Sequence, residues 1–277
     1  MIQRRFSQVD VFTTIPYQGN PVAVILDGDG LTTKQMQAIA RWTNLSETTF
    51  VCKADHPSAD HRLRIFCPAN EMRFAGHPTI GSAHALLSSG IRPKQDGMLV
   101  QECGVGLVKL KTGAEGISIA LPEAQFKPVD EAARKAVEEA IGAPLLETPV
   151  IVDLGVAWLT GQVASGETLR KLNPSMEAMS AVARRVGANG LNVFGLDGET
   201  PEVRSFAPHE GTPEDPVCGS GNGAVAYYLR QRRGAIDYQA RQGRCVGRDG
   251  YIRVGHEGDI IWLGGQAVNC IEGHIVA

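Results

Sequence analysis

The sequence predicts an α+β protein of two similar, pseudo-symmetric domains, each a strongly curved, mostly antiparallel sheet around a central helix. The first observation behind this prediction is an internal repeat. When the chain of 277 residues is compared with itself, residues 36–41 fall on 179–184, at an offset of 143. The second observation is a pair of helical segments made of unusually small residues, 78–87 and 221–229. Because glycine costs a helix about 1 kcal/mol relative to alanine, we expect strands to pack closely around both.

The elements of the first half follow from local patterns. Apolar runs on either side of a Gly-Asn-Pro turn predict two paired strands, 9–12 and 22–26. Thr32 and Gln35 have the spacing of a capping box, and apolar residues at helical spacing come next. The half continues with a strand that ends at Phe-Cys-Pro, the central helix, and two strands joined by a turn, at 64–68, 78–87, 107–110 and 117–121.

The second half repeats this series. Asn173 is the expected N-cap of its first long helix after the connector, with Pro174 at the first helical position. The strand at 204–208 matches 64–68 of the first half at an offset of 140, whereas Gly219 matches Gly76 at an offset of 143. Three extra residues therefore enter between this strand and Gly219. The central helix and two further strands follow, at 221–229, 251–254 and 260–263.

A polar helix over 130–141, with Asp130 as its cap and Gly142 after it, is expected to connect the two halves. The domain boundaries are therefore placed at 1–125 and 126–265. The strand 266–277 is expected to return to the first domain.

The composition excludes several classes of protein. The 27 basic and 30 acidic residues give a formal net charge of −3, which argues against a nucleic-acid-binding protein. No apolar run approaches a membrane span of roughly 18 residues, and no signal-peptide core follows the N-terminus, so a cytoplasmic protein without a membrane is expected. The six cysteines and seven histidines form no Cys-x-x-Cys or His-x-x-x-His pair, so we predict no metal site and no cofactor.

Two glycine-containing loops precede the central helices, at 74–78 and 215–221. The start of a helix has unpaired N–H groups and a partial positive charge, so each loop can bind a carboxylate or stabilise an enolate-like anion without a metal. The glycines would let a ligand approach the backbone closely. The alternative is that 219–223 forms only a tight turn with close helix packing. A phosphate-binding loop is not indicated, because no Lys-Ser/Thr follows the glycines.

Four ordered motifs carry a resemblance to a known family: Gly19-Asn20-Pro21, Asn44-Leu45-Ser46-Glu47-Thr48, 74–79 and 214–220. They resemble signatures of the PhzF-like family of phenazine biosynthesis, which belongs to the diaminopimelate epimerase-like superfamily. A C-terminal pattern that begins at Gln242-Gly243 is also similar, and the resemblance covers essentially the whole chain.

The resemblance implies a cofactor-independent isomerase, a homodimer, that moves a proton on a small carboxylate-bearing substrate in a cleft between the domains. It assigns the general acid/base to Glu47. A carboxylate can act first as base and then as acid if a desolvated cleft lifts its pKa. The catalytic residues that it implies are Glu47, His77 and Asp215, and those that bind the substrate are Asn20, Gly76, Cys218, Gly219 and Ser220.

Cys218 departs from the family pattern, which usually has threonine there. Cys-Gly-Ser-Gly is similar to an active-site loop of epimerases and proline racemases, which use one thiol on each side of the substrate. The repeat gives the symmetric position as 218 − 143 = 75, which is Ala75 and cannot transfer a proton. Two alternatives therefore stay open beside the isomerase: an amino-acid racemase, epimerase or dehydratase that uses Cys218 with Glu47, and a binding protein without turnover.

Overall fold

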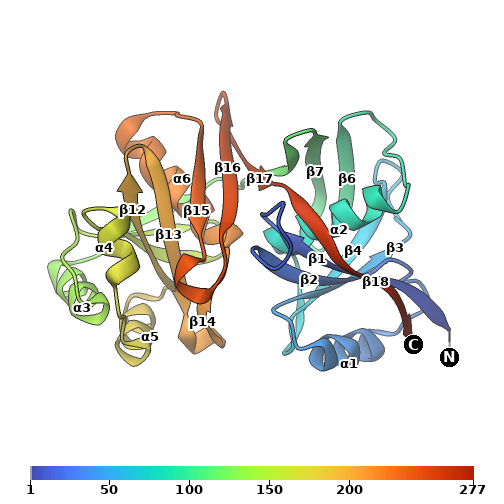
Figure 1. Cartoon of the computed structure of the whole chain (residues 1–277), viewed down its shortest axis with the longest axis horizontal. Helices are drawn as coiled ribbons and strands as arrows, with labels where there is room; N and C mark the ends of the chain where they lie inside the picture. Colours follow the sequence, from blue (N-terminus) through green and yellow to red (C-terminus); the bar gives the residue numbers. More distant parts are fainter. Residues whose placement is uncertain (1) are drawn as a thin grey trace. The chain divides into compact units, whose positions relative to one another are not determined.

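The computed structural model describes residues 2–277, and these form two compact units (Figure 1). Unit 1 contains the chain up to Ala120 together with Gly264–Ala277, and unit 2 contains Leu121–Leu263. The boundaries lie a few residues before the expected ones, since strand β9 (Gln125–Pro128) pairs with β10 (Val150–Asp153) of unit 2. The C-terminal strand β18 (Ala267–Val276) pairs with β1 (Gln3–Val11) of unit 1.

Unit 1 contains two helices, α1 and α2, and its strands come from both the N-terminal and the C-terminal segment of the chain. Their bounds are β1 (Gln3–Val11), β2 (Asn20–Ile25), α1 (Thr33–Thr43), β3 (Thr48–Cys52), β4 (His61–Phe66), β5 (Glu71–Met72), α2 (Gly76–Ser88), β6 (Met98–Cys103), β7 (Gly106–Gly113), β8 (Gly116–Ala120) and β18 (Ala267–Val276).

Unit 2 has the same series with an additional short helix, α4, the connector α3 and two 3-10 turns. Their bounds are β9 (Gln125–Pro128), α3 (Glu131–Ile141), β10 (Val150–Asp153), β11 (Ala157–Gln162), α4 (Gly166–Lys171), α5 (Met176–Val186), β12 (Gly190–Asp197), β13 (Thr200–Ala207), η1 (Pro208–Glu210), β14 (Thr212–Asp215), α6 (Gly219–Arg233), β15 (Tyr238–Gln242), η2 (Arg244–Val246), β16 (Gly250–Glu257) and β17 (Ile260–Gly265). The turn η1 lies where the repeat requires the three extra residues.

The two units share one topology. In unit 1, β2 runs parallel to β3 and β4 runs parallel to β6, while the other pairs are antiparallel. In unit 2 the parallel pairs are β11 with β12 and β13 with β15, and β9 takes the place beside β10 that β18 takes beside β1. The predicted class, α+β with mostly antiparallel sheets, is confirmed.

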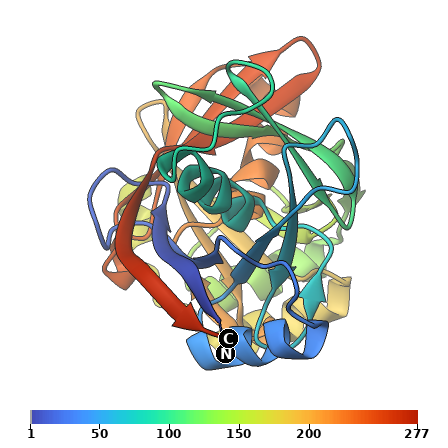
Figure 2. The same cartoon turned by 90° about the vertical axis from the view of Figure 1, so that its right-hand side faces the viewer.

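Each central helix lies among the strands of its own unit. Figure 2 shows the strands of unit 1 arranged around α2, which contacts β1, β2, β3, β4, β8 and β18. Gly81 of α2 has no room for a side chain, since a Cβ there would clash with Val22 Cγ1 and lie 2.9 Å from Val11 Cγ2. A buried hydrogen bond of 2.7 Å between the hydroxyls of Thr49 and Ser82 joins α2 to β3. Small residues therefore allow the close packing that the sequence predicted.

The remaining helices cover the outer faces of the sheets. Met36 and Ala40 of α1 pack against Phe50 and Phe66, whose rings meet edge to face. The capping box at the start of α1 is present, with Thr32 as its N-cap. Helices α3 and α5 pack against the larger core of unit 2.

Two details of the predicted helices are wrong. Asn173 is not a helix cap: α5 begins at Met176, and the hydroxyl of Ser175 accepts the N–H of Ala178. Pro174 therefore lies outside the helix. The central helices begin at Gly76 and Gly219, two residues before the expected starts.

Candidate active site

Glu47 lies immediately before β3, at the end of the loop that follows α1. Asn44 ends α1 in the left-handed conformation, with φ of 54°, and this turns the chain back toward the sheet. The backbone carbonyl of Glu47 accepts the N–H of Ala23 at 3.4 Å, so the parallel pairing of β2 and β3 fixes the residue. The side chain of Glu47 is 15% exposed.

His77 occupies the first turn of α2 and faces this carboxylate. The N-cap of α2 is Ala75, which has no side chain able to accept a hydrogen bond from the helix start. His77 Nε2 lies 3.4 Å from Glu47 Oε2, and the imidazole is 8% exposed. Both atoms are buried, and neither has a hydrogen-bond partner among residues 2–277. The structure thus brings together two predicted site residues, and each retains hydrogen-bonding capacity that a ligand can use.

Asn20 and Gly76 are the other predicted site residues of unit 1. Asn20 begins β2 and is buried, directly after the tight turn at Gly19, whose N–H binds the Asp10 carboxylate at 2.9 Å. Gly76 is the first residue of α2, and a Cβ there would reach only Ile119 Cδ1, at 3.4 Å. Packing within the unit does not require glycine at this position, which leaves room at the helix start.

The predicted residues of unit 2 gather at the start of α6. Asp215 ends β14, and its carboxylate accepts the N–H of Val217 at 3.0 Å, which turns the chain into the helix. Cys218 is the N-cap of α6, where its sulfur accepts the N–H of Gly221 at 3.3 Å. Gly219 is the first helical residue. The hydroxyl oxygen of Ser220 accepts the indole N–H of Trp158 at 3.0 Å.

Gln242 is the centre of a buried amide network under this loop. Its Oε1 accepts the backbone N–H of Cys218 at 3.1 Å and the side chain of Asn222 at 2.7 Å. Its Nε2 donates to the backbone carbonyl of Asp215 at 2.9 Å. Gln242, Asn222 and Trp158 were not predicted from the sequence to support the site, although Gln242 lies in the similar C-terminal pattern.

The environment of Cys218 disfavours its thiolate. The residue is 4% exposed. Burial raises the pKa of the Cys218 thiol well above its usual range, and the nearby Asp215 carboxylate raises it further. A cysteine that acts as a nucleophile or as a base needs a thiolate near neutral pH. The geometry therefore favours a substrate-contacting or structural thiol over a catalytic one.

Among residues 2–277, no group of three or more His, Cys, Asp or Glu side chains has the arrangement of a metal site. No helix in this range is long and apolar enough to cross a membrane.

Comparisons of the sequence identify the family. The model of the family described as "Phenazine biosynthesis-like protein" matches residues 9–273. A Schizosaccharomyces pombe protein, antisense-enhancing sequence 1, is 40% identical over an alignment of 292 positions. The alignment covers 99% of each chain. The trans-2,3-dihydro-3-hydroxyanthranilate isomerase of Pseudomonas chlororaphis is 33% identical over 258 residues, covering 90% of this chain and 89% of that enzyme.

Solved structures agree with this result. The PhzF-family protein of Bacillus anthracis superposes with a TM-score of 0.87 at 26% identity over 100% of both chains. A probable proline racemase from Agrobacterium radiobacter shares the fold alone, with a TM-score of 0.67 at 15% identity over 99% of this chain and 93% of that one. The chain belongs to the phenazine biosynthesis-like (PhzF) family and is an isomerase.

Proposed function

We propose that the protein is a cofactor-independent isomerase that moves a proton between two carbon atoms of a small carboxylate-bearing metabolite, with Glu47 as the general acid/base. The observation that carries this proposal is the buried contact of 3.4 Å between Glu47 Oε2 and His77 Nε2. In a free enzyme, catalytic hydrogen bonds are often long or poorly aligned and shorten only when substrate binds.

The reaction needs no net gain or loss of atoms. The Glu47 carboxylate removes a proton from one carbon, and the electron pair of the broken C–H bond delocalises toward the substrate's unsaturated system. Protonated Glu47 then donates a proton to a second carbon, and the double bond moves; deuterium from solvent enters the product when the carboxyl proton exchanges before this step. His77 hydrogen-bonds the carboxyl group or the substrate, and keeps Glu47 oriented through both steps.

Charge that develops on the substrate during this transfer requires stabilisation. The first N–H groups of α2 at Gly76 and His77 are suited to this, because Ala75 offers them no side-chain cap and a helix start carries partial positive charge. In unit 2, we assign substrate binding to the start of α6. The Ser220 hydroxyl accepts a hydrogen bond from Trp158 and lies 3.5 Å from the Cys218 sulfur, so its own O–H can donate either to that sulfur or to a substrate carboxylate.

The substrate class is argued from chemistry and from one relative. One relative is named trans-2,3-dihydro-3-hydroxyanthranilate isomerase, and the compound in that name is a small carboxylate. This compound is therefore the first probe for turnover, followed by other small unsaturated carboxylates.

The test is the substitution Glu47→Gln, which keeps the shape and removes the base. Isomerisation and uptake of deuterium from solvent into the product are followed by NMR. We expect turnover to fall by about 10²–10⁴-fold, while substrate binding persists. The matched control is Glu139→Gln, an exposed position on the connector helix, which should leave the rate unchanged. Near-wild-type turnover in Glu47→Gln would refute the proposal.

The same measurements distinguish the alternatives. Loss of α-hydrogen exchange in Cys218→Ser would establish a racemase-like use of the thiol, against the expectation from its burial. Tight binding with neither isomerisation nor deuterium exchange across the panel of carboxylates would establish a binding protein.

A further inference from the structure

Two buried hydroxyl groups join β3, the strand that follows Glu47, to α2, the helix that contains His77. The hydroxyl oxygens of Thr49 in β3 and Ser82 in α2 lie 2.7 Å apart, and both residues are 0% exposed. Thr49 is two residues after Glu47, which is roughly 7 Å along a strand. Ser82 is five residues after His77, which is roughly 7.5 Å along a helix. The hydroxyl bond therefore lies beside the Glu47–His77 contact without being part of it.

The strand directs Glu47 and Thr49 to the same side. Side chains alternate along a strand, so residues two apart point to one face. Thr48 points away from α2, since its hydroxyl oxygen lies 2.6 Å from that of Thr43 in α1. Glu47 and Thr49, on either side of it in the chain, both contact α2. The position of α2 against this face of β3 consequently sets the distance between the Glu47 carboxylate and its partner on the helix.

The hydroxyl bond continues into the backbone that holds Glu47. The Thr49 hydroxyl donates to the carbonyl of Ala23 in β2 at 3.3 Å. Because a hydroxyl group has only one proton to donate, the Ser82 hydroxyl supplies the proton of the bond to Thr49. The N–H of Ala23 donates to the carbonyl of Glu47 at 3.4 Å. A continuous series of hydrogen bonds thus runs from the Ser82 hydroxyl to the backbone of Glu47.

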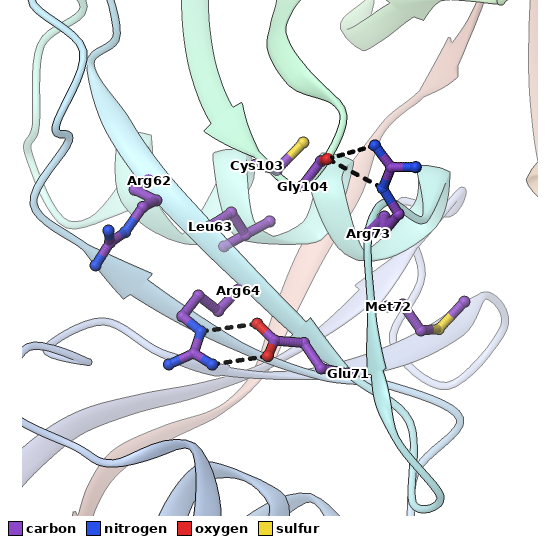
Figure 3. A pocket seen from close by; sticks show the side chains of 8 residues that line it. All are labelled: Arg62, Leu63, Arg64, Glu71, Met72, Arg73, Cys103 and Gly104. Atoms are coloured by element: carbon purple, nitrogen blue, oxygen red, sulfur yellow. Dashed lines mark hydrogen bonds and ion pairs between the residues drawn. The ribbon is translucent and has the colours of Figure 1, made fainter.

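Other polar contacts hold α2 to β6 and to the turn after it. Figure 3 shows Arg73, which precedes the helix and donates through Nε and Nη2 to the carbonyl of Gly104, each at 3.1 Å. Gln101 of β6 donates to the hydroxyl of Thr79 in α2 at 3.1 Å. These bonds do not involve β3. The hydroxyl pair therefore adds a link of defined direction to the strand that follows the proposed acid/base.

The repeat shows that the fold does not need a hydroxyl pair at this place. At the offset of 143, Thr49 corresponds to Asn192 and Ser82 corresponds to Val225. Val225 is buried in an apolar cluster of unit 2, and its side chain cannot form a hydrogen bond. Asn192 instead binds the backbone carbonyl of Gly221 at 2.7 Å. An apolar side chain is thus compatible with this position of a central helix.

The hydroxyl pair occurs in the unit that also has the proposed acid/base. Glu47 corresponds to Gly190 of unit 2, which has no side chain. Two buried hydroxyls that bond each other contribute little net stability, because each has lost its bonds to water, and replacing both by apolar groups of the same shape is nearly neutral. The bond does restrict distance and angle. Its contribution in unit 1 is therefore to geometry more than to stability.

We propose that Thr49 and Ser82 are positioning residues. Their hydroxyl bond keeps α2 at the place along β3 where His77 Nε2 reaches the Glu47 carboxylate. A displacement of about 1 Å in a reacting geometry can reduce a rate by about 100-fold. The effect on turnover rests on the proposed function, whereas the effect on the contact between the two side chains is measured without a substrate.

The direct test measures the Glu47–His77 contact by ¹⁵N NMR of the histidine side chains. In the wild-type background, Glu47→Gln should shift the His77 Nε2 signal, because the group 3.4 Å away changes from a carboxyl to an amide. In the double variant Thr49→Val, Ser82→Ala, the same substitution should shift that signal much less. An undiminished shift in the double variant would overturn the proposal. So would the absence of a shift in both backgrounds, since there would be no contact to maintain.

Two further variants separate positioning from a general loss of stability. Thr49→Ser keeps the hydroxyl and should retain the wild-type response of His77 to Glu47→Gln. Thr160→Val is the matched control: it removes an equally buried hydroxyl from β11, where it donates to the carbonyl of Trp158 at 3.2 Å, and should also leave the response unchanged. Thermal unfolding should show the double variant to be no less stable than Thr160→Val. Loss of the response in either single variant would contradict the proposal.

Turnover of trans-2,3-dihydro-3-hydroxyanthranilate, the first probe of the proposed function, gives a second measurement. The double variant should lower kcat by about ten-fold or more with a much smaller change in KM, because both hydroxyls are buried away from any ligand. Thr49→Ser should restore most of kcat. Wild-type kcat in the double variant would show that the placement of His77 does not limit the rate, and would overturn the proposal. Normal turnover in Glu47→Gln would instead refute the proposed function and leave the NMR result standing.

Discussion

Ala75 and Cys218 occupy the same structural position in the two units: each is the N-cap of its central helix. The cysteine accepts the N–H of Gly221, whereas alanine leaves the start of α2 without a side-chain cap. The two helix starts therefore differ: the start of α6 has a side-chain cap, and the start of α2 has none. One is closed by a protonated thiol, and the other is open beside Glu47 and His77.

The burial of Cys218 predicts low reactivity. Because burial raises its pKa and leaves it 4% exposed, we expect iodoacetamide to modify the exposed Cys245 well before Cys218 in the folded protein. Mass spectrometry of tryptic peptides measures both rates, and Cys245→Ser serves as the control for assignment. Faster alkylation of Cys218 than of Cys245 would contradict this prediction and support the hypothesis that Cys218 is catalytic.

Gly81 predicts a steric limit in the core of unit 1. In Gly81→Ala the added methyl group would clash with Val22, and overpacking of this kind costs about 1–3 kcal/mol. The better helix propensity of alanine offsets up to about 1 kcal/mol of this. Denaturant unfolding should show a net loss of stability. The control is Gly113→Ala in β7, where a Cβ meets nothing within 4 Å, so an equal loss there would rule out the steric explanation.

The two arginine–glutamate pairs of the repeat should differ in their contribution to stability. Removing one charge of a buried pair costs about 3–5 kcal/mol, and the Arg204 and Glu214 side chains are 8% and 9% exposed. The Arg64–Glu71 pair is more exposed, at 23% and 37%, so an effect of about 1 kcal/mol or less is expected there. Glu214→Gln and Glu71→Gln are compared by thermal unfolding. Equal effects would show that burial is not the deciding factor.

His61 predicts a loss of stability in acid. Burial lowers the pKa of its imidazole from 6.5 to about 4, although Gln101 and the Asp60 carboxylate favour the charged form. Between these values the unfolded chain binds a proton that the folded chain does not, so stability falls as the pH drops from 6.5 toward 4. The full effect is about 3 kcal/mol.

Unfolding measured across this pH range tests the assignment. His61→Gln should flatten the pH dependence by most of that amount, while His274→Gln, at an exposed position of β18, should leave it unchanged. A pH dependence that survives in His61→Gln would have to come from other groups.

The sequence predicted the features that depend on residues close together in the chain. The repeat and the small-residue helices predicted the fold class because helix packing requires glycine at positions such as Gly81. The motifs marked Glu47 and His77, but their contact depends on how β3 and α2 pack, and no spacing in the chain encodes that. Ser175 replaced Asn173 as the cap of α5, since either residue can accept a helix N–H and tertiary packing decides between them. Gln242 gave no local signal of its role, because its partners lie on β14 and α6.

The pairing of β1 with β18 has a consequence for the order of synthesis. The N–H of Ile2 donates to Ala277, and the N–H of Ala277 donates back to Ile2, so this ladder joins the earliest and latest parts of the sequence. Unit 2 is a continuous segment, so all of its residues are available once the chain up to Leu263 has left the ribosome. Unit 1 needs 267–276 as well, so β1 keeps an open edge until β18 has been synthesised and can pair with it.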